Sequence, residues 1–205
     1  MEIKNKGEFS RQNIHYWIYF LCLCLLVISM PTSRFLISAS QLLMGINWLV
    51  EGNFKYKFKT FFNNKPALFF TLIFGVHIIG LLWSQDLEYA ITYDLKHKLP
   101  TLTLTLIVVT SPALDIKKIR VLLFLFISTI LLVSFIGFFT YATKDIPSFR
   151  YILPFGSHLY FGLMAIVAAA ILPWLIKQIT NKKYWFYASF LISAWIIYFL
   201  FITRS

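Results

Sequence analysis

The sequence has few charged residues and few cysteines for its length. Only 13% of its 205 residues are charged, whereas 59% are hydrophobic, a composition that ordinary soluble globular domains do not have. The two cysteines, Cys22 and Cys24, lie two positions apart in an apolar run. On a helix their side chains point about 200° apart and cannot share a metal ion. We therefore predict that both face lipid or pack between helices.

Sequence motifs of soluble catalysis are also absent. The chain has no phosphate-binding P-loop, no G-x-G-x-x-G, no H-E-x-x-H and no nucleophile elbow, and we expect neither a cofactor nor a metal. All eight acidic residues lie in loops or at the ends of apolar runs, which argues against an ion-coupled pump that relies on buried carboxylates. The net charge of +11 comes from small groups of Lys and Arg between apolar runs, so it does not indicate nucleic-acid binding.

Long apolar runs make up most of the sequence. A helix needs about 20 apolar residues to cross a hydrocarbon core of about 30 Å, and lipid leaves no backbone group unpaired. We therefore predict an all-α fold, a polytopic transmembrane helical bundle of about seven spans that forms one domain over residues 1–205. The predicted spans are residues 14–30, 35–50, 67–83, 98–112, 119–141, 158–176 and 184–203.

The distribution of basic residues predicts the orientation. With a cytoplasmic N-terminus and every run crossing, thirteen of the 19 Lys and Arg residues are cytoplasmic and six lie outside, as the positive-inside rule requires. The short run 98–112 contains threonines, whose hydroxyls can return to the helix's own carbonyls. If this run did not cross, the split would fall to ten against nine. Five of the six tryptophans lie near run ends, where their rings suit the headgroup layer: Trp17, Trp48, Trp83, Trp174 and Trp185.

A histidine in the third run and the loop between the third and fourth runs are candidates for a functional site. His77 lies within the third run, where it is either hydrogen-bonded packing between helices or a member of a proton relay. The following segment, 83–98, reads W-S-Q-D-L-E-Y-A-I-T-Y-D-L-K-H-K, and its apolar residues recur at helical spacing, which predicts a helix along the membrane surface. Its Lys96 and Lys98 either contact lipid phosphates or hold an anionic lipid-linked substrate.

A second outer segment combines an arginine and a histidine. Arg150 precedes a Pro/Gly turn, and His158 opens the sixth span. An outward-facing arginine and histidine at a helix N-terminus suit a pyrophosphate, because the guanidinium binds oxygens bidentately and the helix dipole favours an anion. His158 equally fits a hydrogen bonder at a helix start. Arg204, just past the last span, is by itself an ordinary interfacial arginine.

Taken together, these features resemble the O-antigen ligase family, which includes O-antigen ligases and related polysaccharide polymerases. The W-S-Q-D of residues 83–86 is similar to the family's W-S-x-D loop. Residues 156–162 resemble its G-x-x-N-x-x-G helix opening, and the terminal T-R-S of residues 203–205 resembles the beginning of its T-x-S-R-G motif. The likeness covers the whole chain as the N-terminal part of a longer member, whose large outer loop would follow Ser205.

The resemblance implies a membrane glycosyltransferase in the bacterial inner membrane. Such an enzyme transfers a glycan from undecaprenyl diphosphate to a lipid A core or a growing polysaccharide on the periplasmic face, without a nucleotide sugar. Its partners are then these two substrates and membrane lipids. In this interpretation Arg150, Arg204 and Lys98 bind the diphosphate, and His158 is the catalytic candidate that positions donor or acceptor. The alternative is a transporter or flippase segment for a lipid-linked or polar solute, with His77 and the short fourth span lining a path.

Overall fold

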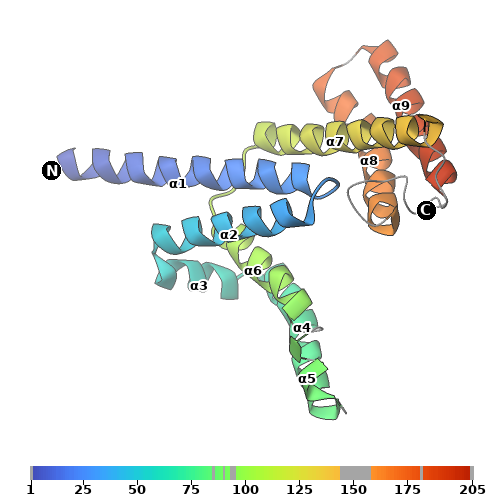
Figure 1. Ribbon diagram of the computed structural model, residues 1–205. Coiled ribbons are helices and arrows are strands. Elements are labelled where there is room, and N and C mark those ends of the chain that lie inside the picture. Colours follow the sequence, from blue (N-terminus) through green and yellow to red (C-terminus); the bar gives the residue numbers. More distant parts are fainter. Residues whose placement is uncertain are drawn as a thin grey trace. The chain divides into compact units, whose positions relative to one another are not determined.

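The computed structural model describes residues 2–84, 86–89, 91–92, 96–143, 158–180 and 182–203, and the secondary structure among them is helical (Figure 1). This confirms the predicted all-α class. The elements are α1 (Glu2–Ser29), α2 (Arg34–Glu51), α3 (Phe54–Phe62), α4 (Lys65–Gly80), the 3-10 helix η1 (Leu81–Trp83), α5 (Leu87–Tyr89), α6 (Lys96–Thr110), α7 (Ile116–Thr143), α8 (His158–Ile179) and α9 (Lys183–Thr203).

Within this described part, four helices are long and apolar enough to cross a membrane: Arg11–Ser29, Ile116–Thr143, Leu159–Ile179 and Lys183–Phe201. They coincide with the first, fifth, sixth and seventh predicted spans. The third and fourth predicted spans form shorter apolar helices, Lys65–Gly80 and Lys98–Thr110. The second forms α2, whose 18 residues carry a charge at each end. The chain therefore has the character of a membrane protein with four candidate spans, where the sequence predicts seven.

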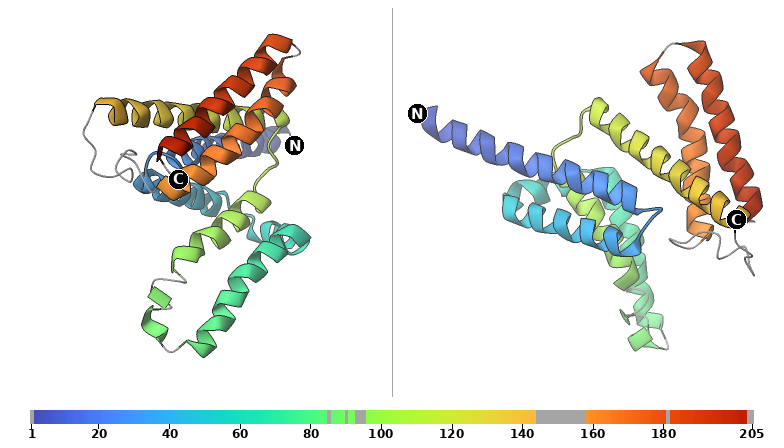
Figure 2. Two further views of the ribbon diagram at one scale, coloured as in Figure 1. Left: turned by 90° about the vertical axis from the view of Figure 1, so that its right-hand side faces the viewer. Right: turned by 45° about the horizontal axis from the view of Figure 1, so that its top comes forward.

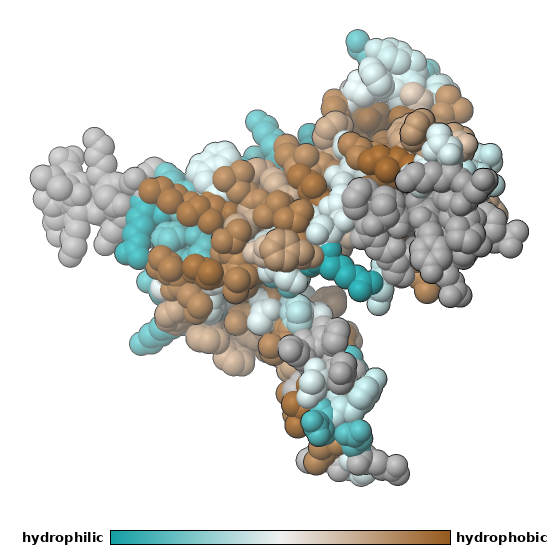
Figure 3. Space-filling model, viewed as in Figure 1, coloured by the Kyte–Doolittle hydropathy of each residue, from teal (hydrophilic) through white to brown (hydrophobic). Residues whose placement is uncertain are grey.

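Exposed apolar side chains support a lipid environment. Leu21, Phe69, Leu163 and Phe201 each expose more than 60% of their surface, and hydrophobic side chains lie open on the outer surface of α1 and α2 (Figure 3). In water, large contiguous apolar patches of this kind are unfavourable. Lipid tails satisfy them, because a helix that crosses a bilayer needs apolar residues on the face that meets lipid.

The chain divides into two compact units, one of residues 1–22 and 39–113 and one of residues 23–38 and 114–205. In the first unit, α4 and α6 pack side by side and α3 contacts both (Figure 2). Two residue pairs are hydrogen-bonded between the first-unit parts of α1 and α2, Arg11 with Val50 and His15 with Asn47. Residue numbers rise along one helix as they fall along the other, which makes these segments antiparallel.

In the second unit, α8 and α9 form a closely packed pair, and α7 contacts both. Their core is apolar, with Ile130, Ala165, Ala168, Ile196 and Phe199 fully buried. Small residues recur four apart on both facing helices, at Ala165 and Ala169 on α8 and at Ser189 and Ser193 on α9, and all four are buried. Small residues at this spacing let two helix backbones approach closely in a membrane.

Local signals set several helix ends. The Asn64 side chain accepts a hydrogen bond from the Ala67 N–H at 3.0 Å and so caps α4. After α2, Gly52 and Asn53 both have positive φ, 74° and 55°, and this left-handed turn ends one helix and starts the next. Within α6, Thr103 and Thr105 donate to carbonyls of the preceding turn. That confirms the prediction that these threonines satisfy their hydroxyls inside the helix.

Candidate functional site

The contact between Lys98 and His77 is the first candidate site. Lys98 lies in the first turn of α6 and His77 in the last turn of α4, and the lysine Nζ is 3.1 Å from the histidine Nδ1. An ammonium group has no acceptor, so Lys98 donates and Nδ1 accepts, which leaves the ring proton on Nε2. Both side chains are half-buried. His77 therefore forms a hydrogen bond between two helices, as the first of its two interpretations expects, and its partner is a predicted substrate-binding residue.

The W-S-Q-D segment lies between these two residues along the chain. Trp83 ends η1 and is 76% exposed, and the Asp86 carboxylate accepts a hydrogen bond from the Tyr89 N–H at 2.9 Å. Asp86 is thus an N-cap for the short helix α5, which explains an aspartate at this place. The described helical residues here are Leu87–Tyr89 and 91–92, and the rest of the predicted surface helix up to residue 95 lies outside the described residues. The Ser84 hydroxyl donates to the Asp86 carbonyl at 3.0 Å and tightens the turn.

Of the other three predicted site residues, the structure describes only the backbone of His158. His158 begins α8, as predicted, but its side chain lies outside the described residues. Arg150 and Arg204 also lie outside them. The structure therefore brings one of the four predicted site residues, Lys98, into a described contact.

A buried lysine that the sequence interpretation assigned to a cytoplasmic loop forms a second polar cluster. The Lys57 side chain on α3 is 3% exposed, and its Nζ lies 2.7 Å from Glu51 Oε2 and 2.7 Å from the Trp48 carbonyl oxygen. The same Nζ is 4.6 Å from the centre of the Trp48 ring. The Trp48 Nε1 donates to Thr110 Oγ1 at 2.7 Å. Trp48 is therefore buried between helices, and the cluster holds α2, α3 and α6 together.

A buried histidine of α1 was also not singled out from the sequence. His15 Nδ1 is 2.8 Å from Asn47 Oδ1, and Asn47 Nδ2 donates to the His15 carbonyl at 3.0 Å. Both side chains are buried. A signal for this pair exists in the sequence, because His15 and Asn47 lie equally far before and after Pro31. Two polar residues at matched distances from a turn meet when the flanking helices are antiparallel.

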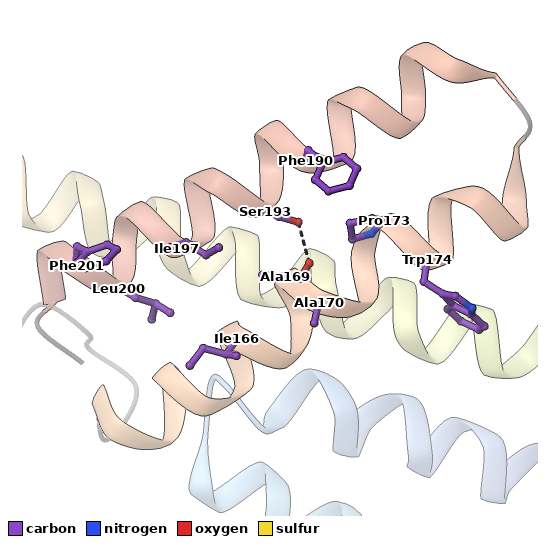
Figure 4. A pocket seen from close by; sticks show the side chains of 10 residues that line it. All are labelled: Ile166, Ala169, Ala170, Pro173, Trp174, Phe190, Ser193, Ile197, Leu200 and Phe201. Atoms are coloured by element: carbon purple, nitrogen blue, oxygen red, sulfur yellow. Dashed lines mark hydrogen bonds between the residues drawn. The ribbon is translucent and has the colours of Figure 1, made fainter.

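An apolar groove runs along the α8–α9 pair. Its volume is about 1000 Å³ (Figure 4), and it is lined by Ile166, Ala169, Ala170, Pro173, Trp174, Phe190, Ser193, Ile197, Leu200 and Phe201. Pro173 has no N–H, so it cannot donate to the Ala169 carbonyl four residues earlier. Ser193 Oγ donates to that carbonyl instead, at 2.9 Å. The groove wall therefore keeps its backbone satisfied despite a proline inside the helix.

Comparison with known proteins gives no relative for this chain. No family model matches the sequence. No curated protein and no solved structure matches it either. Functional inference therefore depends on the geometry around Lys98, on the short motifs of the sequence, and on the apolar groove of the α8–α9 pair.

Proposed function

We propose that this protein is a membrane glycosyltransferase of the O-antigen ligase or polymerase type in the bacterial inner membrane. It would transfer a glycan from undecaprenyl diphosphate to a lipid A core or a growing polysaccharide on the periplasmic face. The observation that carries the proposal is the Lys98–His77 contact beside the W-S-Q-D segment. A diphosphate leaving group develops negative charge, and fixed cations stabilise that charge in the transition state.

The position of Lys98 on packed helices supports a role as an anion-binding cation. The His77 ring accepts through Nδ1 and holds the lysine Nζ in position. The contact joins the ends of α4 and α6, so the cation belongs to packed helices rather than to a loose loop. Positions on packed helices hold a reacting group more closely than loop positions do.

The proposal includes the finer topology, with a cytoplasmic N-terminus and seven spans. At 1.5 Å per residue, α2 is about 27 Å long and the continuous helix from Lys65 to Trp83 about 28 Å, close to the thickness of a hydrocarbon core. The exposed ring of Trp83 suits the headgroup layer at the end of that helix. This threading puts W-S-Q-D, Lys98 and the start of α8 on the outer side.

The remaining predicted residues keep the roles that the resemblance implies. Arg150 and Arg204 would bind diphosphate oxygens, and His158, at the first residue of α8, would position donor or acceptor. A histidine is suited to accept the proton of a sugar hydroxyl, because its charge changes near neutral pH. The dipole of a 22-residue helix adds a favourable field for an anion at that end.

The position of His77 supports an enzyme over a transporter. A transport path for a polar solute requires polar groups near the middle of the membrane. His77 lies three residues before the end of α4 and six before Trp83, which puts it about 9 Å from the proposed headgroup layer. It therefore belongs with the outer loop rather than with a mid-membrane path.

The test measures surface polysaccharide in cells that lack the chromosomal gene and express variants of the protein. Lys98→Ala should lower polysaccharide attachment by about a hundredfold, the usual loss for one transition-state donor, while the protein still inserts. Lys98→Arg should retain part of the activity. The matched control is Lys65→Ala, which removes an exposed lysine at the opposite end of α4 and should leave attachment unchanged.

The membrane leaflet in which lipid-linked glycan accumulates distinguishes a glycosyltransferase from a flippase. Loss of a transferase should leave lipid-linked glycan in the outer leaflet, whereas loss of a flippase should leave it in the inner leaflet. Normal attachment in Lys98→Ala, Arg150→Ala, Arg204→Ala and His158→Ala would refute the enzyme proposal. Donor trapped in the inner leaflet of the Lys98→Ala cells would favour transport.

A further inference from the structure

A small basic pocket lies at the turn between α8 and α9, which we call the lysine pocket. It has a volume of about 320 Å³ and is lined by Lys177, Thr180, Lys182, Lys183, Phe186 and Tyr187. The three lysines are exposed, and no acidic residue is among the lining residues. The first turn of α9 also has no acidic residue. The positive end of the α9 dipole and three ammonium groups therefore act on the same small volume.

The lysine pocket adjoins the apolar groove. Phe186 lines the pocket and Phe190 lines the groove, and their rings pack edge to face with centres 5.1 Å apart. On α8, Pro173 and Lys177 are four residues apart and lie on the same helix face. Figure 4 shows Phe190 from α9 beside Pro173 from α8, at one end of the groove. A ligand that occupies both cavities would have an anionic end and an apolar end.

The dimensions of the two cavities match those of a membrane lipid. Eleven residues separate Lys177 from Ile166 at the far part of the groove, which is about 16 Å along α8. Half of a hydrocarbon core is about 15 Å thick. An acyl chain of one leaflet would therefore run along the groove while its headgroup stays at the lysine pocket. Basic pockets between membrane helices bind anionic headgroups by the same charge complementarity.

We infer that the α8–α9 pair binds one anionic phospholipid, with its phosphate in the lysine pocket and an acyl chain in the apolar groove. The inference is independent of the proposed glycosyl transfer, since Lys177, Lys182 and Lys183 lie at the opposite end of α8 from His158. The bound chain would cover Ile166, Ala170 and Phe190, which are exposed on the groove wall.

The experiment is native mass spectrometry of the full chain with phosphatidylglycerol or with phosphatidylcholine of the same acyl chains. Wild-type protein should retain one phosphatidylglycerol at least about tenfold more tightly than phosphatidylcholine, since lysine contacts favour the anionic headgroup. The Lys177→Gln, Lys182→Gln, Lys183→Gln triple variant should lose that preference. The matched control, Lys55→Gln with Lys59→Gln and Lys65→Gln, removes three exposed lysines elsewhere and should keep it.

A second variant tests the groove separately from the charge. Ala170→Phe fills the groove from an exposed position on α8 without removing a core side chain, and it should weaken retention of phosphatidylglycerol about tenfold while the helices still fold by circular dichroism. Inorganic phosphate at millimolar concentration should not displace the lipid. Equal losses in both triple variants, displacement by phosphate alone, or unchanged retention in Ala170→Phe would each overturn the inference.

Discussion

The two units join their helices in different ways. In the first unit polar contacts join the helices beside apolar ones such as Trp48 with Phe54, and they include a buried lysine paired with a glutamate, a tryptophan bound to a threonine, and two histidine contacts. In the second unit the contacts are mainly between apolar and small residues, with Ser193 and Ser134 supplying hydrogen bonds between helices. Lipid tails are as apolar as leucine, so apolar side chains gain little by leaving lipid for a neighbouring helix.

This difference predicts two kinds of sensitivity. The first unit should respond most strongly when one partner of a charged pair is removed, because a buried charge is left uncompensated. The second should respond most strongly to added volume, because its stability depends on how closely the helix backbones approach. The predictions below compare the two units by the free energy of unfolding in mixed micelles containing SDS, followed by circular dichroism.

The largest effect is expected at the Lys57 cluster. Glu51→Ala should lower the free energy of unfolding by about 3 kcal/mol, because it leaves the ammonium of Lys57 buried without a counter-charge. Lys57→Met removes the charge and keeps most of the side-chain volume, so its effect should be smaller. The double variant should resemble Lys57→Met alone. A double variant less stable than Glu51→Ala would show that packing, not charge, holds α3 in place.

The next effect is expected where α8 meets α9. Ala165 is fully buried, and Ala165→Leu should lower the free energy of unfolding by about 2 kcal/mol through overpacking. Ala194→Leu adds the same volume at an exposed position on α9 and should be nearly neutral. Equal effects at the two positions would mean that close helix approach does not stabilise this unit.

The sequence predicts the helical class and four of the spans because these depend on long apolar runs. It also predicts the start of α8 at His158. The burial of Lys57 could not be read from composition, because it depends on a left-handed turn at Gly52 and Asn53 that leads the chain into α3. The sequence alone does not show which lysine of segment 55–65 is buried, because that depends on how α3 packs in the fold.

The Lys98 contact illustrates the same limit for the candidate site. Each residue could be singled out separately, since both are ionisable and lie near apolar runs. Their pairing depends on the relative position of α4 and α6 along their axes, which a single sequence does not specify. The apolar groove is likewise a property of two helices together, although Pro173 marks the carbonyl that needs a donor from elsewhere.

A smaller effect is expected at the groove wall, and a double-mutant cycle can assign it. Ser193→Ala should lower the free energy of unfolding by about 1 kcal/mol, because the Ala169 carbonyl loses its hydrogen bond in a dry environment. In a Pro173→Ala background, residue 173 regains an N–H that donates to the same carbonyl. The loss on Ser193→Ala should then shrink to a small fraction, and a cycle without coupling would disprove this account.

The smallest effect should occur at the other polar contact of the second unit. Trp195 Nε1 donates to Ser134 Oγ at 3.1 Å, while the Trp195 ring stacks on Phe135 with centres 5.0 Å apart. Ser134→Ala removes the hydrogen bond but leaves the stacking, so the free energy of unfolding should fall by only about 0.6 kcal/mol, a typical value for membrane helix contacts. If this loss matched that of Glu51→Ala, polar contacts would matter equally in both units. The contrast between a polar first unit and a packed second unit would then be wrong.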